Sequence, residues 1–175
     1  PVHSWKDCQT NKLTPEQLES ILINKKPSSF GLITGFGDLE VIDVDLKVFS
    51  TAKEKKEFFD EFIGYLRDNI YDFDKKVAIY KTKNEGYHLL YRSKRVEGNL
   101  KLAKLKGHKE AVIETRGVGG YVFAYHENNV NDLSYFKLDY ISDDDREIIM
   151  SFARMYNYVE EKPKEPVKEK KVYEE

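Results

Sequence analysis

Two aspartates alternate with apolar residues in the segment VIDVD, residues 41–45. Valine and isoleucine favour strands, whereas aspartate is depleted there, so the two acids need an explanation. Alternate residues of a strand lie on one face, so we expect Asp43 and Asp45 to point the same way, opposite to their apolar neighbours. Like charges held this close repel each other unless a cation neutralises them. The pattern therefore predicts a cationic partner, although a solvated face or a pair of turn caps would explain it equally well.

Two further segments carry polar residues suited to the same chemistry. His88 follows the turn KNEG, where the backbone at Gly86 can approach a ligand closely, and Lys83 adds positive charge beside that turn. In IETRGVGG, Glu114 and Arg116 share one face of a strand by the same two-residue period. Each segment alone has an ordinary explanation, namely a hydrogen-bonded histidine in the first and an ion pair across a hairpin in the second.

Taken together, the three acids Asp43, Asp45 and Glu114 form a suitable ligand set for two hard divalent cations. Mg²⁺ and Mn²⁺ prefer carboxylate and water oxygens. A two-metal site of this kind activates an attacking hydroxyl and stabilises the leaving oxygens of phosphoryl transfer. His88 and Arg116 would then hold triphosphate oxygens, the arginine through paired donors.

The elements that must position these residues follow from local patterns. Helices are predicted from Thr14, from Thr51 and from about Ser142, each of which can cap the first turn. Strands are predicted at FGLIT and LEVIDVD, which we expect to pair as a hairpin, at VAIYKT and YHLLYR as a second hairpin, and at AVIET and YVFAY. Strands mixed with flanking helices predict an α+β fold and not a doubly wound parallel sheet.

Composition narrows the class of protein. The chain has 175 residues, enough for one compact domain with extensions, and a net charge of −2, too small to attract nucleic acid or membranes as a whole. Seven Lys/Arg stand against one acid between Arg92 and Lys109, which would suit a phosphate backbone, although most such runs form a solvated face. The single cysteine, Cys8, excludes an intramolecular disulfide, argues against a cysteine zinc site and fits a reducing cytoplasm. No apolar run is long enough to span a membrane.

The chain divides into two parts by composition. Residues 1–158 are predicted to form the catalytic domain, whereas residues 159–175 are charged, contain prolines and have almost nothing apolar to bury. Such a segment is typical of a disordered linker, and it indicates a junction with a further domain.

Three motifs in order, GLITG…LEVIDVD, KTKNEGYHLLYR and IETRGVGGYVFA, resemble the primase-polymerase (prim-pol) family of the archaeo-eukaryotic primase superfamily, over about residues 1–125. The resemblance implies a primase core, with an antiparallel or mixed sheet like that of RNA-recognition motifs and flanking helices. It implies catalytic metal binding by Asp43, Asp45 and Glu114 and nucleotide binding by His88, Arg116, Gly86 and Lys83. Many relatives have serine at the position of Gly86.

The function implied by the resemblance is that of a DNA primase/polymerase, a nucleotidyltransferase that makes or extends primers in DNA replication. Its expected cofactors are Mg²⁺ or Mn²⁺ in a two-metal site. Its expected partners are a single-stranded DNA template, a primer, nucleoside triphosphates, and a C-terminal helicase-like domain or a replication helicase, with no membrane. The expected location is the cytoplasm, and a gene on a phage, virus or plasmid is compatible with the resemblance.

Two other functions remain open. A metal-dependent nuclease is one, because Asp followed by Glu-x-Arg superficially matches the Asp…Glu-x-Lys arrangement of restriction-like folds, but this leaves Asp45 and His88 unexplained. A non-catalytic module for single-stranded nucleic acid is the other, and it would use Tyr87, Tyr91 and Tyr121 with the basic stretch.

Overall fold

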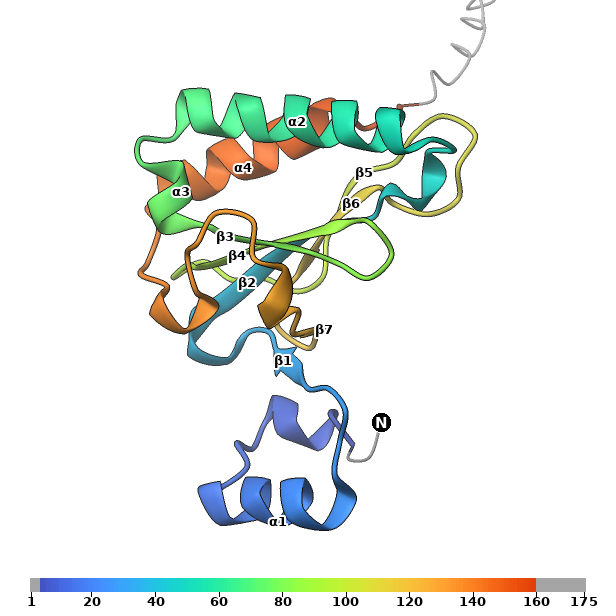
Figure 1. The fold of residues 1–175 in the computed structure, drawn as a ribbon. Helices are drawn as coiled ribbons and strands as arrows, with labels where there is room; N and C mark the ends of the chain where they lie inside the picture. The colour runs from blue at the N-terminus through green and yellow to red at the C-terminus, as the bar shows by residue number, and fades with distance from the viewer. Residues whose placement is uncertain (1–3, 160–175) are drawn as a thin grey trace, which may run out of the picture.

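The computed structural model describes residues 4–159 of the chain. Within that range, five strands form an antiparallel sheet in the order β3–β4–β2–β6–β5, and β1 and β7 form a separate two-stranded sheet (Figure 1). The strands are β1 (Gly31–Ile33), β2 (Leu39–Val44), β3 (Ala78–Lys81), β4 (Tyr87–Arg92), β5 (Lys101–Ala103), β6 (Ile113–Arg116) and β7 (Tyr121–Phe123). The α-helices are α1 (Pro15–Lys25), α2 (Ala52–Asn69), α3 (Phe73–Lys76) and α4 (Asp143–Met155). The predicted α+β fold, an antiparallel sheet with flanking helices, is confirmed.

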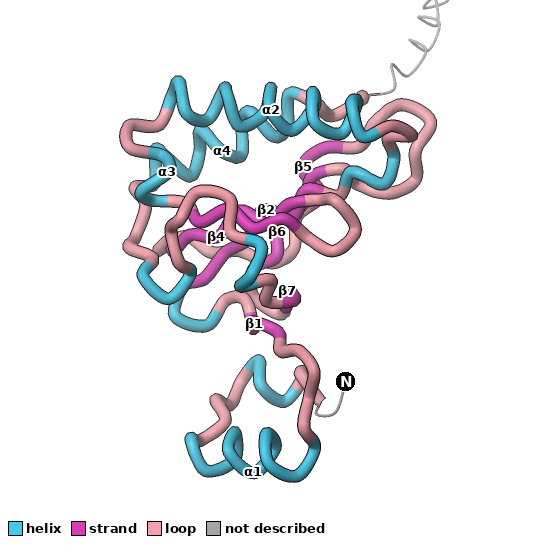
Figure 2. Tube along the Cα trace, viewed as in Figure 1, coloured by secondary structure: helices cyan, strands magenta, loops and turns pink. Residues whose placement is uncertain are grey.

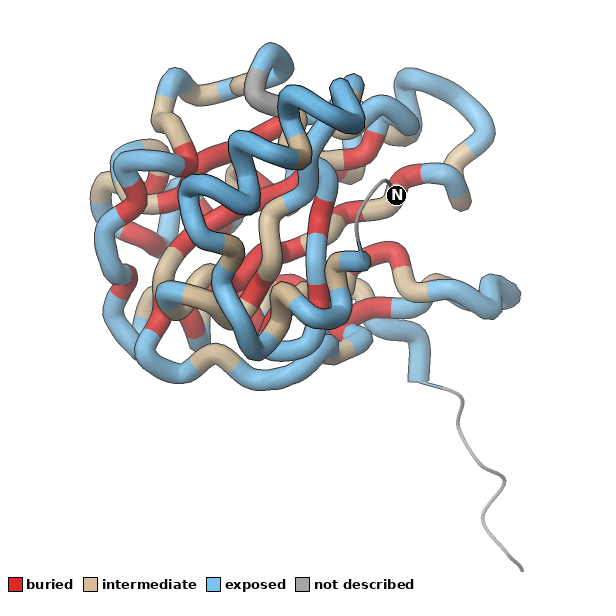
Figure 3. The backbone as a smooth tube through the Cα atoms, turned by 90° about the horizontal axis from the view of Figure 1, so that it is seen from below, coloured by how far each residue is buried: buried red, intermediate tan, exposed pale blue. Residues whose placement is uncertain are grey.

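Helices α2 and α4 lie side by side over one face of the five-stranded sheet (Figure 1). The apolar stripe of α2 is buried against the sheet, in one core whose members include Phe59, Phe62, Ile63 and Leu66 of α2, Ile42 and Val44 of β2, and Ile149 of α4. Buried residues gather in the interior of the molecule, whereas most segments along its edge are exposed (Figure 3). This core holds one face of β2 against the helices. The residues of β2 that alternate with Ile42 and Val44 therefore lie on the other face of the sheet.

Side-chain caps set the starts of three helices. Thr14 and Thr51 each accept a hydrogen bond from the backbone N–H three residues on, and both caps are completed as capping boxes. Ser142 accepts one from the N–H of Asp145, at 3.0 Å, at the start of α4. Each cap satisfies an N–H that has no partner within the helix, which is why these starts can be predicted from a few neighbouring residues.

The second face of the sheet carries a smaller core. Val41 of β2 packs there with Tyr80 of β3, Leu90 of β4 and Val122 of β7. The β1–β7 sheet therefore covers part of this face. Asp43 follows Val41 by two residues and lies on the same face, where its side chain keeps 20% exposure.

The predicted hairpin between FGLIT and LEVIDVD is wrong. Strand β1 pairs with β7, with Leu32 opposite Val122, whereas β2 lies between β4 and β6. The chain does turn between β1 and β2, since the N–H of Gly35 donates to the carbonyl oxygen of Leu39 at 2.8 Å. Successive strands usually pair, but here the turn sends them into two different sheets. The second predicted hairpin, β3 with β4, is confirmed.

The ends of the described chain differ in their contacts. Helix α1 lies apart from the main sheet and buries none of its residues (Figure 2). The predicted linker at 159–175 lies outside the described residues except for Val159, so the domain boundary stays a prediction. None of the helices within residues 4–159 has the length and apolar character that a membrane crossing requires.

Candidate active site

A row of polar side chains crosses the three central strands of the main sheet. Asp43 of β2 stands directly opposite His88 of β4 on one side and Glu114 of β6 on the other. Residues opposite each other in antiparallel strands have Cβ atoms about 4.5–5.5 Å apart, so the three side chains are neighbours. Register alone thus brings together residues from three separate segments, on the face of the sheet turned away from α2 and α4.

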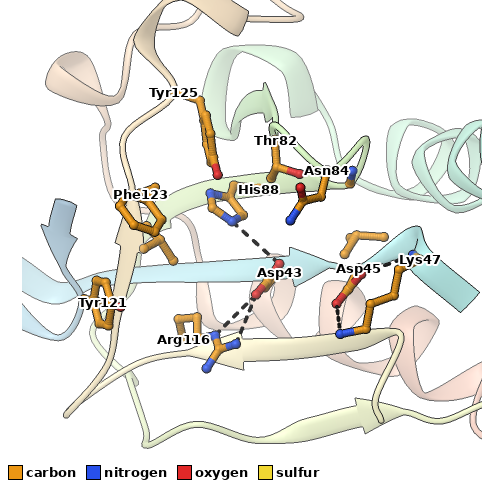
Figure 4. Close-up of a pocket in the computed structure, with 13 residues that line it drawn as sticks. Asp43, Asp45, Lys47, Thr82, Asn84, His88, Arg116, Tyr121, Phe123 and Tyr125 are labelled. Atoms are coloured by element: carbon orange, nitrogen blue, oxygen red, sulfur yellow. Dashed lines mark hydrogen bonds and ion pairs between the residues drawn. The ribbon is translucent and has the colours of Figure 1, made fainter. Parts of the chain in front are cut away.

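Arg116 supplies a cationic partner for Asp43 and for Glu114. Its Nε and Nη2 donate to Oδ2 of Asp43 at 3.3 and 3.2 Å (Figure 4). Nη2 also donates to Oε1 of Glu114 at 2.5 Å. The arginine reaches both acids because it lies on the same face of β6 as Glu114, two residues further along the strand. In this conformation one guanidinium is shared between the two acids of the row.

Asp45 lies one residue beyond the end of β2 and has a different cation. Its carboxylate caps the short 3₁₀ helix Leu46–Val48 by accepting from the N–H of Lys47 at 3.1 Å. The ammonium group of Lys47 lies 2.9 Å from the same carboxylate and also contacts Glu110. These hydrogen bonds, the one to Glu110 first, raise the pKa of Lys47 above its usual value.

Burial favours the neutral form of two groups of the row, so it shifts their pKa values in opposite directions. Burial lowers the pKa of His88, and the nearby charge of Asp43 opposes this only in part. The imidazole is therefore neutral at pH 7, and its Nε2 lies 3.6 Å from Oδ1 of Asp43, too far for a hydrogen bond. Burial also raises the pKa of Glu114, against the charge of Arg116.

The turn between β3 and β4 presses against the end of β2. The N–H of Gly86 donates to Oγ1 of Thr82 at 3.0 Å, and a Cβ at this position would collide with the carbonyl oxygen of Val44. This close approach explains why glycine, which has no Cβ, stands at this position. Glu85 turns away from the row and pairs with Lys55 of α2 at 2.6 Å, so its negative charge does not face the site.

A cavity of about 390 Å³ opens beside the row. The predicted site residues that line it are Asp43, Asp45, Gly86, His88 and Arg116. Glu114 contacts Arg116 but is not among the lining residues, and Lys83 is exposed on the turn outside the cavity. The structure thus brings most of the predicted residues to one place and leaves Lys83 apart from them.

The cavity has further lining residues that the sequence patterns had not assigned to the catalytic site, although Tyr121 had been considered for a module that binds single strands. They are Lys47, Thr82 and Asn84 at one end and Tyr121, Phe123 and Tyr125 at the other (Figure 4). The three aromatic residues alternate along the chain, so the two-residue period used for Glu114 and Arg116 could have found them. The other three offered no comparable signal, since a lysine and two polar turn residues are common on any surface.

The tyrosines expected of a binding module do not form one surface. Tyr91 is fully buried and donates to Oε2 of Glu40 at 2.9 Å, and Tyr87 is stacked on Phe59 of α2 with ring centroids 3.4 Å apart. Both belong to the helix-covered core, because they alternate with His88 along β4. Only Tyr121 of the three is exposed, so the predicted aromatic platform of Tyr87, Tyr91 and Tyr121 is wrong.

Comparison with known proteins places the chain in a family. A family model described as Prim-Pol, bifunctional DNA primase/polymerase, N-terminal, matches residues 1–136, a range that contains every predicted site residue. None of the curated proteins that were compared matches the chain. The match spans more than three-quarters of the 175 residues and agrees with the resemblance seen in the three motifs. The chain therefore belongs to the Prim-Pol family of bifunctional DNA primase/polymerase N-terminal domains.

Proposed function

We propose that this chain is the catalytic domain of a DNA primase/polymerase, which transfers nucleotides from nucleoside triphosphates to a 3′-hydroxyl on a DNA template. The observation that carries the proposal is the row His88–Asp43–Glu114 across β4, β2 and β6, beside a cavity, in a chain of the Prim-Pol family. Carboxylates and a neutral imidazole on one rigid sheet face are groups that can position a metal-bound triphosphate.

The proposed metal ligands are Asp43, Asp45 and Glu114. Their carboxylate oxygens are the donors that Mg²⁺ and Mn²⁺ prefer, and all three come from the same face of the sheet or its end. Bound Mg²⁺ or Mn²⁺ would supply activation of the attacking hydroxyl and stabilisation of the leaving oxygens. Within residues 4–159, no three aspartate, glutamate, histidine or cysteine side chains are grouped closely enough in this conformation to hold a metal ion.

The ion pairs of the site explain this arrangement and indicate what must change. Arg116 and Lys47 now hold the carboxylates that a metal would need. Asp43 and Glu114 would offer both of their carboxylate oxygens to a metal ion only if these pairs opened, because Oδ2 of Asp43 and Oε1 of Glu114 accept hydrogen bonds from the guanidinium. Arg116 would then be free to bind phosphate oxygens through paired donors, which is the role proposed for it.

The test is incorporation of labelled nucleotides on a single-stranded DNA template, with and without a primer. We expect incorporation in Mg²⁺ or Mn²⁺ and none after chelation by EDTA, since the carboxylates alone cannot replace the charge of the ions. A parallel reaction with DNA and metal but no nucleotide separates the nuclease alternative, because only a nuclease would degrade the DNA there. Degradation without incorporation would overturn the proposal.

His88 is proposed to hold the triphosphate through a hydrogen bond from its imidazole. Replacing it with alanine should raise KM for the nucleotide by about 10- to 100-fold with a smaller effect on kcat, since a hydrogen bond to a charged group is worth about 1.5–3 kcal/mol. Steady-state extension kinetics measure both constants. His108→Ala is the matched control, because His108 is exposed and lies outside the cavity. A defect in template affinity with unchanged KM for nucleotide would contradict the assigned role.

The expected partners belong to the same proposal. A single-stranded DNA template, a primer and nucleoside triphosphates follow from the proposed reaction. A helicase-like domain after residue 158, or a separate replication helicase, follows from the resemblance together with the charged composition of residues 159–175. Cytoplasmic location follows from the proposed role in replication.

A further inference from the structure

A ladder of aromatic rings forms one wall of the cavity. Tyr121 and Phe123 of β7 and Tyr125 just beyond it alternate along the chain, and we call these three residues the aromatic ladder. Ring centroids are 6.2 Å apart for the first pair and 6.4 Å apart for the second. All three rings line the cavity (Figure 4), and Phe123 keeps 51% and Tyr121 36% of its surface exposed.

The ladder continues at both ends. Trp5, from the segment before α1, lies against Tyr121 with ring centroids 4.5 Å apart. At the other end, the ring of Tyr125 lies 5.5 Å from that of His88, which belongs to the row across the sheet. A continuous path of rings therefore leads from the N-terminal segment to the proposed reaction centre.

Packing does not account for the exposed rings of the ladder. Val122, which lies between two of them, is the β7 residue that is buried in the smaller core with Val41 and Tyr80. The rings at 121 and 123 point to the opposite side, where they contact water. Exposed aromatic surface gathered in a cavity marks a binding surface, since each ring could otherwise lower its free energy by burial.

The charges of the cavity favour a ligand that is held by its bases. Among the lining residues, the acids Asp43 and Asp45 are balanced by the cations Lys47 and Arg116. Without metal the lining has no excess of positive charge to attract phosphates. Affinity at this wall must therefore come from stacking on the rings, which every nucleobase can provide.

We propose that the aromatic ladder stacks successive bases of a single-stranded nucleic acid and leads it to the row at Asp43. A row of rings fits a strand better than a lone nucleotide, because one base covers one ring and leaves the others exposed. That this strand is the template rests on the proposed function, whereas the stacking itself does not. The ladder would align the template base with the nucleotide held at His88.

The test compares the binding of two labelled single strands by fluorescence anisotropy, in EDTA and without nucleotide. One is a short oligothymidine and the other an abasic strand of the same length, which keeps the phosphates and lacks the bases. Phe123→Ala and Tyr121→Ala should each weaken oligothymidine binding by about tenfold, the usual effect of removing a stacking ring, and leave abasic binding unchanged. Phe123→Trp should bind at least as well as the original protein.

Control variants separate the ladder from general effects. Tyr71→Ala removes an 83% exposed ring outside the cavity and should change neither affinity. Phe123→Leu keeps an apolar side chain without the ring, so it should bind as weakly as Phe123→Ala while its thermal unfolding matches that of the original protein. Equal losses for both strands, or no loss with oligothymidine, would overturn the proposal.

The outcomes also distinguish this proposal from the proposed function. If the protein incorporates no nucleotide, yet the ladder variants lose oligothymidine binding, the polymerase assignment fails and the ladder stands. If the ladder variants lose affinity for a labelled nucleoside triphosphate in Mg²⁺ and keep affinity for the strand, the rings hold the incoming base, and the ladder as a strand site is refuted.

Discussion

Replacing Asp43 with asparagine should lower nucleotide incorporation by about 1,000-fold or more and leave the fold intact. The carboxylate stands at the centre of the row, directly between His88 of β4 and Glu114 of β6. Losing its charge removes several kcal/mol of metal and transition-state stabilisation, and about 4 kcal/mol corresponds to that factor. Asparagine keeps the shape and can still accept a hydrogen bond from Arg116, which is why folding should survive.

Primer extension under steady-state conditions measures the loss, and thermal unfolding followed by circular dichroism checks the fold. Asp68→Asn is the matched control, because Asp68 is an exposed acid on α2, the helix that covers the opposite face of the sheet. That variant should incorporate nucleotides at the original rate. Incorporation by Asp43→Asn within about tenfold of the original rate would remove Asp43 from the proposed metal site.

Replacing Arg146 with alanine should lower the free energy of unfolding by about 3–5 kcal/mol. Arg146 of α4 donates from Nε and Nη2 to the carboxylate of Glu40 on β2, at 2.7 and 2.9 Å. The side chains are 5% and 0% exposed, so the variant leaves a buried carboxylate without its cation. Since small domains are stable by about 5–15 kcal/mol, much of the stability would be lost.

Denaturation in urea, followed by fluorescence or circular dichroism, measures this change. Arg154→Ala is the control on the same helix, because Arg154 pairs with Glu147 at 3.6 Å and both side chains are about half exposed. That change should cost less than about 1 kcal/mol. The double variant Glu40→Gln with Arg146→Met should recover much of the stability, since no buried charge remains and the amide still accepts from Tyr91. Equal losses for Arg146→Ala and Arg154→Ala would contradict the role of the buried pair.

The two predictions concern opposite faces of one strand. Glu40 and Asp43 lie three residues apart on β2, so one carboxylate faces the helices and the other faces the cavity. The pair of Glu40 with Arg146 ties β2 to α4 and thereby holds the strand that carries Asp43. We expect Arg146→Ala to affect activity through lost folding, whereas Asp43→Asn affects activity alone.

Local patterns in the sequence determined the elements and much of the row. The helix starts at Thr51 and Ser142 depend on hydrogen bonds to residues three positions away, and the faces of Asp43 and Glu114 depend on a period of two. Such short-range rules act before the chain finds its long-range contacts. The order of the three motifs also indicated the family that the family model shows.

Tertiary structure alone decided which segments meet and which cations hold the acids. β1 pairs with a strand about 90 residues away in the chain, and Arg146 reaches Glu40 across a similar distance in sequence. No spacing rule links such residues, because these pairings depend on how the layers on both faces of the main sheet pack together. The same holds for Trp5 against Tyr121, the contact that extends the aromatic ladder. The sequence therefore determined the chemical groups and the faces on which they lie, and the long-range contacts, whose free energy comes from burial, decided their partners.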